Sequence, residues 1–168
     1  MTKWQQLQTF LEAIKFSHSV FALPFALIAM VVAAVGVPAL WDIFWIVVAC
    51  VPARTAAIAF KRLADFQFDL RNPRTAGRAM VRGELTPRFM VSALVASSLV
   101  FIVSAAMLNR TCFLLSVPVL AVLFGYSLTK RFTKFSHFFL GGALALAPLG
   151  AWIAIREDIA IPPILLGL

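Results

Sequence analysis

Charged residues are scarce in this sequence: Asp, Glu, Lys and Arg together make up 13% of its 168 residues, whereas a soluble domain has about 25%. Hydrophobic residues reach 62%, and the mean hydropathy is +0.94. An apolar excess of this size cannot be hidden in the core of an 18.4 kDa protein. The composition therefore excludes an ordinary soluble domain and a disordered chain, and it indicates an integral membrane protein.

Cysteines and acidic residues are also few. Cys50 and Cys112 each lie inside an apolar stretch without a Cys or His neighbour at ligand spacing, which excludes a secreted disulfide scaffold and a cysteine metal site. Seven acidic residues stand against 15 Lys and Arg, a net charge of +8. In so apolar a chain this excess indicates cytoplasmic loops and anionic partners such as phosphates or lipid headgroups, and we expect no nucleic-acid partner.

Several apolar runs approach the length of about 20 residues that a membrane-spanning helix needs. A further run, 159–168, contains ten residues, which as a helix cover about half of a hydrocarbon core. We therefore predict an all-α polytopic membrane helix bundle with five complete transmembrane helices and a truncated sixth. The five predicted spans are 16–36, 43–60, 89–108, 112–128 and 137–155.

The first 15 residues show a helical repeat of apolar side chains. Trp4, Leu7, Phe10, Leu11 and Ile14 recur at three- and four-residue spacing, with polar residues between them. This pattern predicts an amphipathic helix over 1–15 that lies at the membrane interface. The apolar run that follows is too long for the core of a cleavable signal peptide.

Lys and Arg are distributed unevenly between the two sides of the predicted bundle. Twelve of them fall in the N-terminal segment and in loops 61–88 and 129–136, whereas the opposite side has Arg110 and Arg156. The positive-inside rule then places the N-terminus and loop 61–88 in the cytoplasm. We expect a multi-pass protein of a bacterial inner membrane.

Loop 61–88 carries ten of the chain's 22 charged residues. We expect the preceding helix to end near Asn72–Pro73, because a proline disfavours a helical residue before it, and Thr86–Pro87 to cap and begin the next helix. Asp65 and Asp69 are four residues apart, so on a continuing helix they share one face with about 6 Å between their Cβ atoms. Two such carboxylates are typical ligands for Mg²⁺ that also binds substrate phosphates, and arginine side chains match phosphate oxygens. The pattern fits a metal–diphosphate site, and ordinary ion pairing on a solvated loop is the alternative. The arginines are Arg71, Arg74, Arg78 and Arg82.

Arg54 is a charged residue inside the second predicted span. Together with positions 58, 61, 65 and 69 it forms one stripe along a helix. A charge within a span normally faces the bundle interior or a wet cavity, although its side chain can also reach back to the interface. The stripe favours a polar site that extends from the loop into the membrane.

These residues resemble the first aspartate-rich motif of the UbiA family of membrane prenyltransferases. The family pattern is Asn-x-x-x-Asp-x-x-x-Asp, preceded by an Arg and followed by Arg-Thr-x-x-Arg. Here Arg54, the pair Asp65 and Asp69, and Arg74–Arg78 match it, with Lys61 at the position of the Asn. Phe16–Leu27 resembles the first helix of the 4-hydroxybenzoate polyprenyltransferase-like branch. Tyr126–Thr133 resembles the family's Tyr-x-x-x-Lys-Arg-x-Thr loop. The resemblance covers essentially the whole chain.

The resemblance implies an enzyme that transfers a polyprenyl group from its diphosphate to an aromatic acceptor in the bilayer. A 4-hydroxybenzoate-like acceptor is implied, within quinone biosynthesis of the ubiquinone or menaquinone kind. The resemblance also implies Asp65 and Asp69 as ligands of diphosphate-bound Mg²⁺, and Arg54 as a residue near the acceptor. For Lys130 and Arg131 the alternative is that they only set the membrane orientation as cytoplasmic charges, and for Tyr126 that it is an interfacial-belt tyrosine. The implied substrate-binding residues are Lys61, Arg74, Arg78, Tyr126, Lys130 and Arg131.

Two departures from the family pattern affect this reading. Lys61 replaces the motif Asn, and an ammonium group is a donor that repels a metal; we expect weaker metal binding, although Lys61 can also contact diphosphate. The family has nine spans and a second Asp-x-x-x-Asp motif, so we expect 1–168 to be the N-terminal portion of such a domain. A non-catalytic, truncated or decayed homologue that binds prenyl diphosphate or lipid is the alternative. The signature of CDP-alcohol phosphotransferases is absent.

Overall fold

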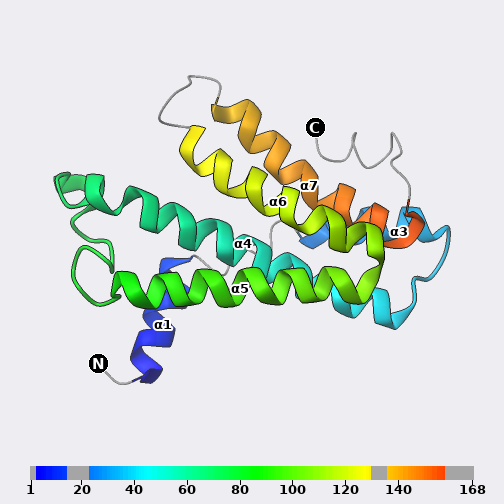
Figure 1. Ribbon diagram of the computed structural model, residues 1–168, viewed down its shortest axis with the longest axis horizontal. Coiled ribbons are helices and arrows are strands. Elements are labelled where there is room, and N and C mark those ends of the chain that lie inside the picture. The colour runs from blue at the N-terminus through cyan, green and yellow to red at the C-terminus, as the bar shows by residue number, and fades with distance from the viewer. Residues whose placement is uncertain (1–2, 15–22, 130–135, 158–168) are drawn as a thin grey trace.

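The computed structural model describes residues 3–14, 23–129 and 136–157 (Figure 1). Every regular element in these ranges is helical, which confirms the predicted all-α class. The elements are α1 (Lys3–Ala13), α3 (Leu23–Ala34), α4 (Leu40–Asp69), the short 3-10 helix η1 (Pro73–Thr75), α5 (Pro87–Leu108), α6 (Arg110–Thr129) and α7 (Ser136–Arg156).

Within the described ranges, three helices are long and apolar enough to cross a membrane, namely α4, α5 and α6. They correspond to the second, third and fourth predicted spans. Helix α7 has 21 residues and matches the fifth predicted span, whereas α3 provides 12 residues of the first. The predicted sixth run, 159–168, lies outside the described residues.

The long helices pack side by side as a bundle (Figure 1). Helix α4 packs against α5 and α6, and α3 packs against α7. One core cluster joins α3, α4 and α7 through small side chains such as Ala26, Ala29 and Ala151, which let the helix backbones approach closely. Large apolar side chains such as Leu99 and Val117 are exposed, as expected where lipid covers the protein.

Residues 70–86 connect α4 to α5 at one end of the bundle, called the loop end below. Helix α1, which falls within the segment 1–15 expected to be helical, packs here. Phe10 and Ile14 are buried in a core cluster with Met80 and Leu85 of the connection. The ring of Phe10 also meets that of Phe89 edge-on, with centroids 5.5 Å apart. Part of the apolar face expected to lie in the membrane interface therefore packs on the protein.

The far end of the bundle is held together by side-chain hydrogen bonds to helix ends. The Asn109 amide donates to the carbonyl oxygens of Ile153 (2.9 Å) and Ala154 (3.1 Å). Arg156 Nε donates to the carbonyl oxygen of Ala33 at 2.9 Å. The Ile153 carbonyl also accepts from the Glu157 N–H at 3.0 Å. The side-chain contacts add partners for carbonyls near helix C-termini, and they attach α7 to the α5–α6 turn and to α3.

Candidate functional site

Helix α4 carries the stripe of polar residues predicted from the sequence. It continues without interruption to Asp69, so Asp65 and Asp69 lie one turn apart on one helix face, as expected. The helix ends three residues before the predicted stop at Asn72–Pro73. Arg54, Lys61 and Asp65 are partly buried, and Asp69 is buried.

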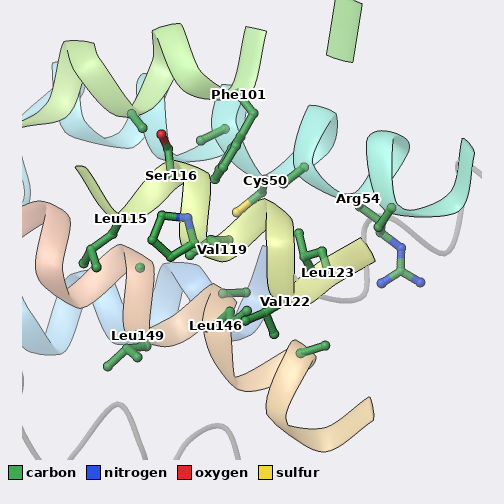
Figure 2. A pocket seen from close by; sticks show the side chains of 18 of the residues that line it. Cys50, Arg54, Phe101, Leu115, Ser116, Val119, Val122, Leu123, Leu146 and Leu149 are labelled. Carbon is green, nitrogen blue, oxygen red and sulfur yellow. The ribbon is translucent and has the colours of Figure 1, made fainter. Parts of the chain in front are cut away.

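A cavity of about 500 Å³ lies between α4, α5, α6 and α7. It is lined along α4 from Ile46 to Lys61 and along α6 from Cys112 to Ser127, distances of about 22 Å each at the helical rise. Most of the wall is aliphatic, as Figure 2 shows for Leu115, Leu146 and Leu149. The cavity therefore offers a long apolar channel within the bundle.

Arg54, Lys61 and Tyr126 are polar residues in the wall of this cavity. Figure 2 shows the Arg54 guanidinium at the end of the cavity away from Leu115. Its Nε atom is buried and has no hydrogen-bond partner among the described residues. An unpaired buried donor costs about 1–3 kcal/mol, so the site favours a ligand that brings an acceptor to Arg54.

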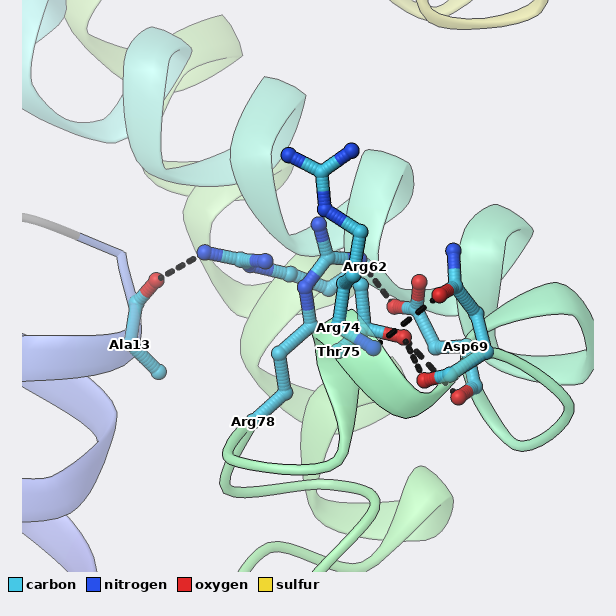
Figure 3. A network of polar contacts seen from close by, with 7 residues as sticks. Ala13, Arg62, Asp69, Arg74, Thr75 and Arg78 are labelled. Carbon is cyan, nitrogen blue, oxygen red and sulfur yellow. Dashed lines mark hydrogen bonds and ion pairs between the residues drawn. The ribbon is translucent and has the colours of Figure 1, made fainter.

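The connection between α4 and α5 presents arginines beside the end of α4 (Figure 3). Arg78 Nη1 forms an ion pair with Asp69 Oδ2. The Thr75 hydroxyl donates to the carbonyl oxygens of Asp69 (2.9 Å) and Asn72 (3.0 Å). Arg74 is exposed, and its backbone N–H donates to the Asn72 side chain at 3.0 Å. The Arg-Thr-x-x-Arg segment thus folds back onto the second carboxylate of the motif.

The rest of the connection is a set of turns that ends at the N-terminal cap of α5. The Glu84 N–H donates to the Ala79 carbonyl at 2.9 Å and the Gly83 N–H to the Met80 carbonyl at 3.3 Å, which is the Schellman pattern. Gly83 has φ +76°, a conformation that glycine adopts without strain. Thr86 then caps α5, as predicted, because its side chain accepts from Phe89 N at 3.2 Å.

Helix α1 and the residue that follows it also contact the loop end of the bundle. Arg62 Nη2 donates to the carbonyl oxygen of Ala13 at 3.2 Å (Figure 3). Ile14, which is 1% exposed, packs with Leu85 and Met80. The sequence did not indicate that α1 supports the arginine-bearing connection, because the contact joins segments that are far apart in the chain.

The donor set can be tested against Mg²⁺, the metal implied by the resemblance. No group of three or more His, Cys, Asp or Glu side chains that could hold a metal ion occurs within the described ranges. Asp65 and Asp69 on one helix face fit Mg²⁺, which commonly takes one or two carboxylates and completes its shell with waters and phosphate oxygens. The residues therefore fit a metal that arrives with a diphosphate.

The structure brings the described site residues together in two groups along α4. Arg54, Lys61 and Tyr126 share the cavity, and Asp69 contacts Arg78. Lys130 and Arg131 lie outside the described residues. The sequence reading missed Phe101, Ser116 and other wall residues of α5 and α6. They have no motif, and their apolar or small side chains resemble those of any packed helix.

The fold and site define a class: a polytopic helical membrane protein with basic side chains in the wall of an apolar cavity. The helix that carries them ends in carboxylates beside an arginine-bearing loop. The family model described as "UbiA prenyltransferase family" matches residues 22–168. The chain therefore belongs to the UbiA prenyltransferase family.

Relatives and solved structures agree with this assignment. The 4-hydroxybenzoate octaprenyltransferase of Hydrogenovibrio crunogenus is 31% identical over 163 residues, which cover 92% of this chain and 55% of that protein. The enzyme of the same name from Escherichia fergusonii is 31% identical over 133 residues, with 79% and 46% covered. The chain thus spans about half the length of the curated relatives it matches.

Two solved structures share the fold. The apo structure of a UbiA homolog from Aeropyrum pernix K1 superposes with a TM-score of 0.78 at 32% identity, covering 87% of this chain and 53% of that one. A digeranylgeranylglyceryl phosphate synthase superposes with a TM-score of 0.84 at 14% identity, covering 96% and 57%. The second likeness shows the fold alone.

Proposed function

We propose that this chain takes part in transferring a polyprenyl group from its diphosphate to an aromatic acceptor of the 4-hydroxybenzoate type, as a step of quinone biosynthesis. One observation carries the proposal: an apolar cavity ends at Arg54 and Lys61, and the same helix face continues to Asp65 and Asp69 beside Arg78. A substrate with a long apolar tail and a polyanionic head matches this site, because its tail fits the apolar cavity and its head fits the charged end.

The cavity suits the prenyl chain. Its walls along α4 and α6 extend for about 22 Å and are largely aliphatic, so they can cover an isoprenoid tail and exclude water. Exclusion of water matters for the reaction, because an allylic cation formed in the cavity would otherwise be hydrolysed. The diphosphate head would then lie at the loop end.

The polar end suits the leaving group. Asp65 and Asp69 would hold Mg²⁺ through the diphosphate, and the metal would stabilise the negative charge that develops there. Arg74 and Arg78 would donate to phosphate oxygens, and we assign the same role to Lys130 and Arg131. The ion pair of Arg78 with Asp69 in this structure supports a position for its guanidinium beside the metal and the diphosphate.

Arg54 suits the acceptor. Its Nε lacks a partner among the described residues, and its guanidinium can hold a carboxylate bidentately. Such a contact would orient a benzoate ring inside the cavity, where Tyr126 also contributes to the wall. In the transfer, the diphosphate leaves with the C–O bonding electrons, a ring carbon forms the new C–C bond, and the ring releases a proton.

The alternative proposal is a homologue that binds prenyl diphosphate or lipid without transferring the prenyl group. Lys61 favours it, because a cation stands in the cavity wall one turn before Asp65, at the position where the family motif has Asn. Binding and transfer are separable measurements, so one set of membranes can distinguish the two functions.

The test uses membranes that contain the full chain, with 4-hydroxybenzoate, geranyl diphosphate and Mg²⁺, and with chromatography of the prenylated acid. Asp65→Asn and Asp69→Asn should each reduce the rate by about 100-fold, the typical loss when charge stabilisation of a reacting group is removed. Asp42→Asn is the matched control, because Asp42 lies in the first turn of the same helix. Binding of geranyl diphosphate without product would support the alternative, and absence of both would contradict both proposals.

A further inference from the structure

Lys61 is a basic residue in the wall of a largely apolar cavity. It lies seven residues after Arg54 on α4, which is two turns and about 10 Å along the same helix face. Both side chains line the same cavity. The cavity thus has two cationic positions, one deeper in the bundle and one at the loop end, next to Asp65.

The charge balance around Lys61 favours an anion. Residues 61–84 contain six basic and three acidic side chains, a surplus of three positive charges. Whichever basic groups pair with the three carboxylates, further basic groups are left over at this end of the bundle. Two of the pairings are those of Asp69 with Arg78 and of Glu84 with Arg82. A ligand with several negative charges would offset the surplus.

The chemistry of an ammonium group restricts what Lys61 can contact. It has three donors and no acceptor, so it cannot coordinate a metal, but it binds phosphate oxygens as a compact point charge. Its contact would be strengthened by the apolar wall, because electrostatic interactions are stronger where water is excluded. The neighbouring Phe60 stacks on Phe124 with centroids 4.7 Å apart, which fixes α4 against α6 at this level.

We infer that Lys61 binds a phosphate of the prenyl diphosphate directly at the loop end of the cavity, and so supplies part of the positive charge that Mg²⁺ supplies at Asp65 and Asp69. The inference rests on the proposed function, in which the diphosphate lies at this end. It predicts that the chain keeps affinity for a prenyl diphosphate when divalent metal is removed, and that this retained affinity depends on Lys61.

The test is equilibrium binding of geranyl thiolodiphosphate, a slowly reacting analogue, to the full chain in phosphatidylcholine nanodiscs, with either Mg²⁺ or EDTA present. In EDTA, Lys61→Asn and Lys61→Met should raise the Kd by about 10-fold, which corresponds to about 1.4 kcal/mol. In Mg²⁺ the same substitutions should raise it by less than about 3-fold, and Lys61→Arg should stay near the natural chain in both media. The loss in EDTA is that of one charged hydrogen bond. The loss in Mg²⁺ should be smaller because the metal supplies positive charge to the same phosphate.

Arg88→Gln is the matched control. Arg88 is exposed at the start of α5 and is not part of the cavity wall, so removing its charge should leave the Kd within about 2-fold in both media. Equal Kd values for the natural chain and Lys61→Asn in EDTA, with tight binding in Mg²⁺, would overturn the role of Lys61 and leave the proposed function standing. Failure of the natural chain to bind in either medium would overturn both.

Discussion

Replacing Ile14 by alanine should loosen the arginine-bearing connection, although the two are distant in the sequence. Ile14 is 1% exposed and belongs to the core cluster that includes Met80 and Leu85 of that connection. We expect the turns that present Arg78 to open more often when this anchor is shortened. The prediction tests whether α1 and the residue that follows it support the arginine-bearing connection.

The size of the effect follows from the buried carbons. Ile14→Ala removes three carbon atoms, and about 0.8 kcal/mol per buried methylene gives about 2.4 kcal/mol, near the lower limit of the range of about 2–5 kcal/mol for such substitutions. This corresponds to about a 50-fold larger population of the opened connection. Ile14→Val removes one carbon and should raise that population by about 4-fold.

Limited trypsin digestion in detergent micelles measures this population, because cleavage after Arg78 and Arg82 requires an open backbone. When opening is fast relative to cleavage, the cleavage rate follows the open population. Cleavage after Arg110, at the far end, serves as an internal reference, and Gln8→Ala on the exposed side of α1 should change the rate by less than about 2-fold. Equal rates for Ile14→Ala and Gln8→Ala would refute the reasoning.

Two further substitutions test the local geometry. Gly83 has φ +76°, and a Cβ at this position would have no atom within 4 Å. Gly83→Ala therefore introduces conformational strain alone, which should cost about 1 kcal/mol and make trypsin cleavage of the connection about 5-fold faster. Gly77→Ala, where a Cβ meets neither strain nor a close atom, should leave the cleavage rate unchanged. Asn109→Ala removes two hydrogen bonds to the C-terminal carbonyls of α7 and the acceptor for the Cys112 N–H. The three losses should cost about 3 kcal/mol, lowering the unfolding midpoint by about 6–12 °C. Ser92→Ala, which removes an exposed contact within α5, should leave that midpoint unchanged, and a similar decrease in both variants would contradict the assigned role of Asn109.

Much of the membrane architecture could be predicted from the sequence because the relevant physics is local. The cost of placing charged groups in lipid determines where apolar runs end, so predicted spans 89–108 and 112–128 agree with α5 and α6 within two residues. Thr86 was predicted as a helix cap for the same reason, since capping involves residues three apart. Helix α4 extends well past its predicted apolar span, 43–60, because its last turns are stabilised at the loop end rather than by lipid.

Contacts between distant segments could not be predicted in this way. The pattern of α1 predicted which side chains share its apolar face, but not that Phe10 and Ile14 would pack on protein while Trp4 stays exposed. Lipid and a protein core both accept an apolar surface, so amphipathicity alone cannot distinguish them. The pairing of Asp69 with Arg78 also depends on how the connection folds back, which is determined by its turns.

The candidate site also combines residues positioned by local helix geometry with residues positioned by contacts between distant segments. Arg54, Lys61, Asp65 and Asp69 lie on one continuous helix, so the helical period alone places them on one face and sets their spacing of one or two turns. The other contributors come from separate elements, and their positions depend on packing between helices. A substitution on α4 therefore changes a functional group whose position is fixed by the helix. A substitution such as Ile14→Ala keeps the functional groups of the site but alters where the connection holds them. The two kinds of variant should differ in binding and proteolysis, which makes the assignment of roles within the site testable residue by residue.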